Sequence, residues 1–351
     1  MTVELAPVDG PMVWGAKDMC DPKQWTHTLS PADSAELKSA SAALQGRTIE
    51  SLRKADFPLP ALDLKLKQVR KEVLHGRGFA VLRGLDVKDA PLADIARIFW
   101  GIGSWFGEAI SQNRDGQLLG HVTDIGARAD HPQQRGFQSA DALPFHTDVA
   151  GDLIALLCLR PAKTGGLSSV ASAANLYNEM LRRHPTLLAQ LLRPVSWDRR
   201  AEIPAGKLPW YELPIFSHHH GRLIVAFVYR FIVSAQEFTG APGLGSLQRE
   251  AIETLINLAA EETMHVSMDF QPGDIQLVNN LAVLHNRTAY TDHSPPDPPR
   301  HLLRLWLAAD NAWPLPQAFY DRYPGRAANG RPAGIVIEGV EARARLDPRE
   351  R

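Results

Sequence analysis

A histidine and a carboxylate stand two positions apart in the segment Pro144-Phe145-His146-Thr147-Asp148. On a β-strand, residues i and i+2 point to the same side, so the side chains of His146 and Asp148 can reach one point. A second histidine, His285, directly follows an apolar run that should form another strand. Two imidazoles and one carboxylate form the ligand set of non-haem Fe(II) oxygenases. The same donors also serve in catalytic zinc sites, so these three residues predict a metal site and leave the metal open.

Two arginines follow His285 in a segment that is otherwise apolar. Arg300 precedes, and Arg304 lies within, the run Leu302-Leu303-Arg304-Leu305-Trp306-Leu307. A guanidinium in a hydrophobic strand costs several kcal/mol unless an anion meets it, and a carboxylate held by two hydrogen bonds is the natural partner. Positions 300 and 304 are an even number apart, so both side chains should point inward. This pair therefore predicts a clamp for a bound carboxylate, which a zinc hydrolase does not need.

The elements that position these residues follow from hydrophobic periodicity. In the second part of the chain, short apolar runs between turn residues predict strands of an antiparallel barrel or sandwich. The predicted strands are Gln117–Val122, Leu153–Leu159, Leu167–Ser172, Arg222–Val228, His265–Phe270, Asp274–Val278 and Leu302–Ala308. Helical spacing predicts helices after the Ser30-Pro31 cap and over Leu62–His75, Pro91–Phe106, Ser172–His184 and Leu247–Glu262.

The domain organisation predicted from this pattern has three parts. Residues 1–56 form an N-terminal arm with one helix, residues 57–324 form a single domain with helical insertions, and residues 325–351 form a loosely held C-terminal tail. The tail prediction depends on its richness in Arg, Gly and Pro.

Composition limits the classes of function. The 351 residues are 44% hydrophobic and 22% charged, which is typical of globular proteins, and 38 Lys and Arg stand against 39 Asp and Glu. A net charge of −1 provides no basic excess for a phosphate backbone, so we expect no nucleic-acid partner. The longest apolar run is far too short to span a bilayer, and no signal peptide is recognisable. We expect a cytoplasmic protein with a small-molecule partner and no membrane partner, and homo-oligomer formation stays open.

The chain resembles the taurine dioxygenase and clavaminate synthase-like family of Fe(II)- and 2-oxoglutarate-dependent oxygenases. The resemblance covers about residues 78–307 and depends on four segments in the order that the family has them. These are Gly78-Phe79-Ala80-Val81-Leu82-Arg83-Gly84-Leu85, Phe145-His146-Thr147-Asp148 with Leu156 to Pro161, Lys163-Thr164-Gly165-Gly166-Leu167-Ser168, and Pro272-Gly273-Asp274 through His285-Asn286-Arg287-Thr288-Ala289 to Arg304. The family fold is an α+β double-stranded β-helix, a jelly roll with flanking helices.

The resemblance implies a role for individual residues. His146, Asp148 and His285 would bind Fe(II), and Arg300 would pair with the distal (C5) carboxylate of 2-oxoglutarate. Ser168 stands where many members have a threonine that bonds this carboxylate, so the hydroxyl is kept and a methyl is lost. Arg304 matches a position that meets an anionic group of the substrate in several members. Asn280 would make a structural hydrogen bond and would not be a ligand.

Three further residues are candidates for substrate binding. In similar proteins, the segment that contains Gln112 and Asn113 helps to line the substrate pocket, although a polar turn is the alternative. Arg230, with Tyr229, is predicted to end an apolar strand and is the third candidate.

The implied activity is that of a dioxygenase. The resemblance predicts hydroxylation of a small anionic metabolite, like a carboxylate or an amino acid, with Fe(II), 2-oxoglutarate and O2 and release of succinate and CO2. Desaturation, ring closure and epimerisation use the same ligands and stay open, whereas a halogenase would need a small residue in place of Asp148. A barrel that binds a small molecule without catalysis is the alternative from another class.

Overall fold

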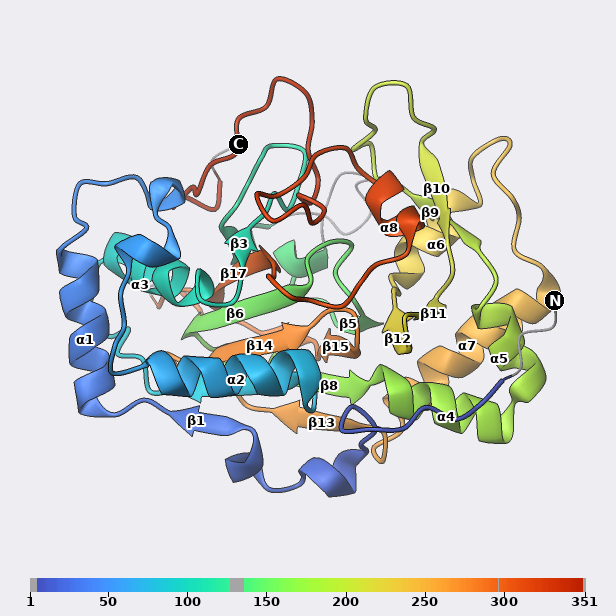
Figure 1. Cartoon of the computed structure of the whole chain (residues 1–351), viewed down its shortest axis with the longest axis horizontal. Helices are drawn as coiled ribbons and strands as arrows, with labels where there is room; N and C mark the ends of the chain where they lie inside the picture. The colour runs from blue at the N-terminus through green and yellow to red at the C-terminus, as the bar shows by residue number, and fades with distance from the viewer. Residues whose placement is uncertain (1–4, 127–135, 296, 350–351) are drawn as a thin grey trace.

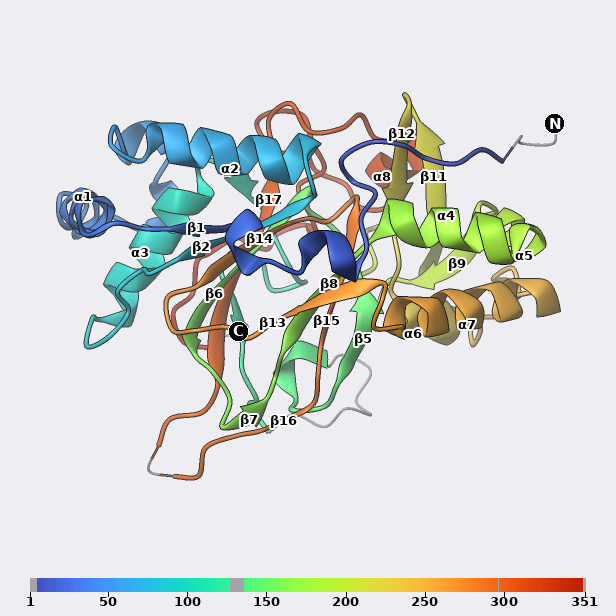
Figure 2. The ribbon, with the colours of Figure 1, turned by 90° about the horizontal axis from the view of Figure 1, so that it is seen from below.

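The structure is a computed structural model that describes residues 5–126, 136–295 and 297–349. Its centre consists of two β-sheets, with helices α1 to α3 gathered toward one end and α4 to α7 toward the other (Figures 1 and 2). In the described residues, the α-helices are Pro31–Ala42 (α1), Asp63–His75 (α2), Leu92–Gly103 (α3), Ala173–Arg183 (α4), Pro185–Leu191 (α5), Tyr229–Ala235 (α6), Ser246–Ala260 (α7) and Gln317–Asp321 (α8). None of the helices in this part of the chain has both the length and the apolar character that a membrane crossing requires.

The larger sheet has the strand order β1-β2-β14-β6-β17-β3, and β4 also pairs with β17. Its strands are Thr26–Thr28 (β1), Phe79–Arg83 (β2), Glu108–Ala109 (β3), Gly120–Val122 (β4), Leu153–Arg160 (β6), Ile275–Asn279 (β14) and His301–Ala308 (β17). Only β1 and β2 are parallel; the other described pairs are antiparallel.

The smaller sheet has the order β13-β8-β15-β5 and carries much of the site. Its strands are Leu143–His146 (β5), Ser168–Ser172 (β8), His265–Met268 (β13) and Val283–Arg287 (β15). Three two-stranded ribbons complete the described strands: Thr164–Gly165 (β7) with Tyr290–Thr291 (β16), Val195–Asp198 (β9) with Trp210–Leu213 (β10), and Phe216–His219 (β11) with Arg222–Val225 (β12).

Alternation along β17 explains how an arginine reaches the interior. Leu303, Leu305 and Leu307 belong to the hydrophobic cluster formed with α2 and α3. Leu302 and Trp306 belong to the other cluster, which contains residues of both sheets and of helices α4 and α7. Because strand side chains alternate, Arg304 lies on the same inner side as Leu302 and Trp306. Both faces of the central strands β2, β6, β14 and β17 are buried, which is why these strands are mostly apolar.

Part of the segment after residue 324 packs against the rest of the chain, whereas most of its described residues are exposed or half-buried, and the loosely held tail stays a prediction. Ile335 is fully buried, and Ser111 and Gly334 form a β-bridge. Arg331 forms a buried ion pair with Asp152, with Nε 3.0 Å from Oδ2. The arginines that suggested a solvated tail therefore include one that neutralises a core carboxylate. Residues 350–351 lie outside the described residues, and the domain boundaries at 56 and 324 stay a prediction.

Candidate active site

Asn280 fixes the loop that carries Asp148. Strand β5 ends at His146, so Asp148 lies just beyond it. The side-chain Oδ1 of Asn280 accepts a hydrogen bond from the backbone N–H of Asp148 at 2.8 Å. Its Nδ2 donates to the carbonyls of Asp148, Ala150 and Gly151 at 3.0, 3.2 and 3.0 Å. Asn280 thus makes structural hydrogen bonds, as predicted, and orders the loop around the carboxylate.

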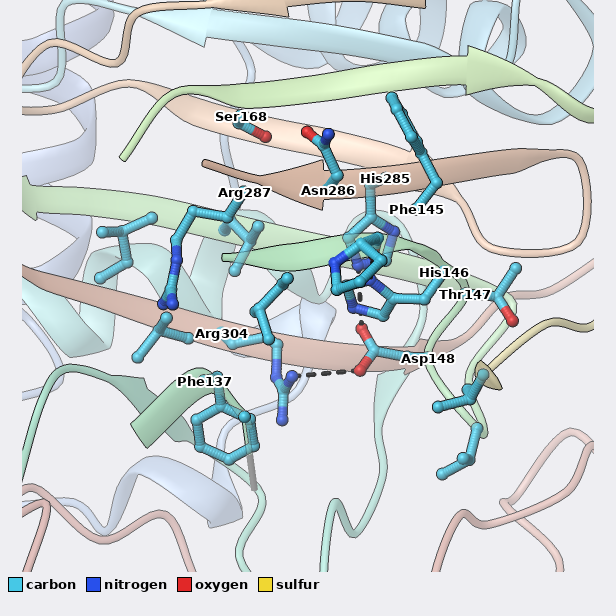
Figure 3. Close-up of a pocket in the computed structure, with 18 of the residues that line it drawn as sticks. Phe137, Phe145, His146, Thr147, Asp148, Ser168, His285, Asn286, Arg287 and Arg304 are labelled. Carbon is cyan, nitrogen blue, oxygen red and sulfur yellow. Dashed lines mark hydrogen bonds and ion pairs between the residues drawn. The ribbon is translucent and has the colours of Figure 1, made fainter. Parts of the chain in front are cut away.

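His146 and His285 face each other across two paired strands. They are direct partners in the register of β5 and β15, and their ring centroids lie 4.4 Å apart. His285 Nε2 lies 3.7 Å from Asp148 Oδ2. Figure 3 shows both rings and the carboxylate gathered in one pocket. The structure therefore brings together the three residues that the sequence grouped.

The donor atoms of these three side chains fit a divalent metal ion in chemistry. His146 Nδ1 lies 2.7 Å from the carbonyl of Pro144 and so carries the proton, which leaves the Nε2 lone pair for a metal. Asp148 Oδ2 is buried and has no hydrogen-bond partner, and His285 Nε2 is the ring nitrogen that faces it. His285 Nε2 and Asp148 Oδ2 lie 3.7 Å apart, and among the described residues no group of three or more His, Cys, Asp or Glu side chains has the spacing needed to hold a metal ion as the structure stands. The case for metal binding therefore depends on the chemistry of the donor atoms.

The protonation states suit metal ligands. Burial, reinforced by His146, lowers the pKa of His285 to about 3, and burial also lowers the pKa of His146. Burial alone would raise the pKa of Asp148, but Arg304 and the two histidines outweigh it, so the net pKa is lowered. At neutral pH, the site consists of two neutral imidazoles and one carboxylate, the forms that coordinate metals.

Arg304 pairs with the carboxylate of Asp148. Its Nη1 donates to Asp148 Oδ1 at 3.1 Å, and its Nε donates to Gln112 Oε1 at 2.8 Å. The guanidinium also lies over the rings of Phe137 and Trp306, at 4.3 and 5.1 Å from their centroids. Arg304 is therefore a positioned cation of the pocket, and it contacts a predicted ligand.

Gln112 and Asn113 have different locations. Gln112 lines the pocket, and its Nε2 donates to the carbonyls of Leu118 and Arg304, both at 2.9 Å, so its amide positions Arg304. The Asn113 side chain bonds within its own loop, with Nδ2 donating to Gln117 Oε1 at 3.1 Å. Asn113 is not among the residues that line the pocket. The structure does not bring it to the site, because its side chain closes the turn that follows, where its Oδ1 accepts hydrogen bonds from the backbone N–H groups of Asp115 and Gln117.

Arg300 is a buried cation with an unpaired donor. Its side chain lines the pocket and its Nη1 has no hydrogen-bond partner. Two hydrogen bonds fix the backbone of Arg300. Its N–H donates to Asp292 Oδ1 at 2.7 Å, and its carbonyl accepts from Thr123 Oγ1 at 2.7 Å. Ser168, on β8, lines the same pocket, and its hydroxyl has only long contacts, of 3.4 and 3.5 Å, with the side-chain amide of Gln276. Both side chains have capacity for an anion.

Arg230 lies at the exposed rim of the pocket. The prediction that it ends a strand is wrong, because β12 ends at Val225 and helix α6 begins at Tyr229. Helix α6 is held against β9, where Ser234 Oγ donates to Asp198 Oδ2 at 2.8 Å. This tertiary contact overrides the strand preference of the apolar run before it.

Sequence reasoning gave no role to Arg287, which also lines the pocket. It stands two residues after His285 on β15 and directly opposite Ser168 on β8. The signal was present in the sequence, since a residue two positions after a site histidine shares its strand face. The cavity that these residues line has a volume of about 170 Å³.

Comparison with known proteins gives the family. Residues 41–306 match the model of the family described as "Taurine catabolism dioxygenase TauD, TfdA family". FR-33289 synthase of Streptomyces rubellomurinus (strain ATCC 31215) is 34% identical over 335 residues, which is 93% of this chain and 97% of that protein. The taurine hydroxylase-like protein SAT17 of Stachybotrys chartarum (strain CBS 109288 / IBT 7711) is 31% identical over 318 residues, or 87% of this chain and 81% of that protein.

Solved structures confirm the predicted fold class. Asparagine oxygenase (AsnO) superposes with a TM-score of 0.61 at 18% identity and covers 89% of this chain and 99% of its own. The non-heme iron oxygenase OrfP in complex with Fe and alpha-ketoglutaric acid has a TM-score of 0.61 at 16% identity and covers 81% of this chain and 94% of its own. The α+β jelly roll and the predicted dioxygenase class are thus confirmed: the chain belongs to the TauD/TfdA family of dioxygenases.

Proposed function

We propose that this chain is an Fe(II)- and 2-oxoglutarate-dependent dioxygenase that hydroxylates a small anionic metabolite. The observation that carries the proposal is the convergence of His146, Asp148 and His285 in a pocket that also holds the unpaired guanidinium of Arg300. Family membership supports it, as do the iron and alpha-ketoglutaric acid named for the OrfP complex. When bound, iron, 2-oxoglutarate and O2 supply oxidative chemistry that yields succinate and CO2.

The chain's own residues would provide binding and orientation. The two histidines and Asp148 hold the metal, and Asn280 keeps the Asp148 loop in place. Arg300 and Ser168 bind the distal carboxylate of 2-oxoglutarate, because each offers a polar atom that the protein leaves unpaired or weakly bonded. The apolar walls around them exclude water, which strengthens these charge pairs.

The substrate class follows from the cations at the other side of the pocket. Arg304 and Arg230 line the site where a substrate would enter, so a carboxylate or a similar anion is the group that they would recognise. Structures of fold relatives contain hydroxylated amino acids, 3-hydroxyasparagine in asparagine oxygenase and 3-hydroxy-L-Arg in OrfP. We propose an amino acid or a related carboxylate as substrate and the cytoplasm as location.

A substrate screen tests this function. The protein is loaded anaerobically with Fe(II) and 2-oxoglutarate, mixed with single amino acids and small carboxylates, and exposed to air while succinate is measured. We expect one class of substrate to accelerate succinate release, and Asp148→Gly to abolish that release since it removes one metal ligand. If the protein neither binds 2-oxoglutarate nor releases succinate with any compound, the alternative of a non-catalytic barrel replaces this proposal.

A further inference from the structure

Four buried hydrogen-bond donors without partners belong to two arginines of the pocket lining and to Tyr290, a tyrosine that both arginines contact. They are Nε and Nη1 of Arg287, Nη1 of Arg300 and the hydroxyl of Tyr290. The two guanidinium carbons lie 4.8 and 5.1 Å from the centre of the Tyr290 ring. Arg287, Arg300 and Tyr290 are only 5%, 3% and 8% exposed. Unpaired donors at this depth are costly, so their concentration points to a missing acceptor.

This cluster lies at the Ser168 end of the pocket. Arg287 and Ser168 are direct partners in the register of β15 and β8, so their side chains share one face. Figure 3 shows Arg287 on the side of the pocket away from Asp148, with Ser168 above it. At Gly166, a β-carbon would lie 3.1 Å from Arg300 Nε, so the glycine leaves room for that guanidinium. Arg287, Ser168 and Arg300 thus lie around the same end of the pocket.

The charges of the cluster call for an anion. Arg287 uses Nη2 for structure, donating to the carbonyls of Ser139, at 2.8 Å, and Asp141. Its other nitrogens are left for a ligand. A guanidinium stays protonated in proteins at neutral pH, so Arg287 and Arg300 both carry a positive charge. Two buried like charges persist beside each other at low cost only if a negative group lies between them.

We propose that Arg287 is a second cation for the distal carboxylate of 2-oxoglutarate, acting with Arg300, Ser168 and the Tyr290 hydroxyl. The inference deepens the proposed function and depends on it. A carboxylate that meets two guanidinium groups gains charge-assisted hydrogen bonds that a 2-oxo acid without a second carboxylate cannot make. Arg287 would therefore determine selectivity for a dicarboxylate co-substrate.

Two 2-oxo acids separate this role from a purely structural one. 2-Oxopentanoate has the same carbon chain as 2-oxoglutarate but lacks the distal carboxylate. 2-Oxoglutarate and 2-oxopentanoate are each titrated anaerobically into the Fe(II)-loaded protein. Binding is followed by the visible charge-transfer band and by calorimetry. In Arg287→Met, we expect the Kd of 2-oxoglutarate to rise about 10- to 100-fold and the Kd of 2-oxopentanoate to stay unchanged. Arg287→Lys, which keeps the charge and a donor for Ser139, should recover part of the affinity for 2-oxoglutarate.

Other outcomes overturn the inference. If Arg287→Met and Arg287→Lys weaken both 2-oxo acids equally and lower Tm, Arg287 only holds the Ser139–Asp141 loop. If the Kd of 2-oxoglutarate is unchanged while the substrate KM rises, Arg287 belongs to the substrate site. If the unsubstituted protein binds no 2-oxoglutarate, the proposed function itself fails, and the inference fails with it. This outcome is distinct from the others because it is seen in the unsubstituted protein and not only in the variants.

Discussion

Arg304 Nη1 lies 3.1 Å from Asp148 Oδ1, so the residue proposed to recognise the substrate is in direct contact with a proposed metal ligand. Metal ligation would then use Asp148 Oδ2, which is buried and has no hydrogen-bond partner. Each oxygen of one carboxylate thus has its own function. A substrate anion that approaches Arg304 therefore arrives next to the carboxylate of the metal site.

Removal of Arg304 should affect the substrate more than the co-substrate. In Arg304→Ala, we expect the KM for the primary substrate to rise by at least tenfold, because a buried charge-assisted contact is lost. The slow decarboxylation of 2-oxoglutarate without substrate should persist, which succinate measurements can establish. Loss of this uncoupled reaction in Arg304→Ala, with its retention in Arg300→Ala, would reverse the roles of the two arginines.

Removal of Arg300 should act on the co-substrate. Arg300→Ala leaves the distal carboxylate of 2-oxoglutarate without its main partner, at a cost of about 3–5 kcal/mol. The KM for 2-oxoglutarate should therefore rise by about two to four orders of magnitude. Fe(II) affinity, measured by anaerobic titration, should change little. An unchanged KM for 2-oxoglutarate would contradict the assignment of Arg300.

The metal assignment predicts a spectroscopic signature. The protein with Fe(II) and 2-oxoglutarate under anaerobic conditions should give a weak visible charge-transfer band. His146→Ala and His285→Ala should each abolish it, because each removes a neutral imidazole ligand. His219→Ala, on the β11–β12 hairpin, is the matched control and should keep the band. Retention of the band in both site variants would exclude these histidines as ligands.

A buried histidine pair predicts a pH dependence of stability. His121 Nε2 donates to the carbonyl of Arg345 at 3.0 Å, so its Nδ1 accepts a hydrogen bond from His301 Nε2 at 2.8 Å. Burial lowers the pKa of His301 from 6.5 to about 3, and His121 and Arg160 contribute smaller effects in the same direction. As the pH falls below 6.5, the unfolded chain takes up a proton that the folded chain does not. The free energy of unfolding should therefore fall by about 1.4 kcal/mol per pH unit from this residue, and this loss is absent above the unfolded pKa.

The comparison that isolates this effect uses His301→Gln, whose amide does not titrate. Urea denaturation of the metal-free protein at about pH 7.5 and about pH 5 should give a steeper pH dependence for the unsubstituted chain than for the variant. Equal slopes would show that His301 takes up its proton in the folded state as readily as in the unfolded state.

The ion pair between Arg331 and Asp152 predicts a large effect on stability. Arg331→Met leaves a buried carboxylate without its partner, so the free energy of unfolding should fall by about 3–5 kcal/mol. Arg326→Met, at an exposed position of the same segment, is the matched control and should change stability by less than about 0.5 kcal/mol. Equal stability of the two variants in denaturant would mean that the buried pair contributes nothing net.

The sequence predicted those parts of the site that depend on local periodicity. Arg304 was identified because a charge in an apolar strand needs a partner, and the alternation of β17 turns it inward beside Leu302 and Trp306. For Arg287, periodicity gives the strand face that it shares with His285, but its neighbours Ser168 and Tyr290 meet it only through strand pairing and packing. Likewise, the partner of Arg331 lies 179 positions away, a contact that composition cannot reveal. Local rules thus located the strands, and long-range contacts decided which polar residues face the pocket.

The pairing of Asp152 with Arg331 also connects the site to a distant part of the chain. Asp152 Oδ2 accepts hydrogen bonds from Arg331 and from the backbone N–H of Ala309. The backbone carbonyl of Asp152 accepts a hydrogen bond from the N–H of Asn280, the residue that holds the Asp148 loop. A substitution in residues 325–349, far from the pocket in sequence, can therefore disturb the position of a proposed metal ligand.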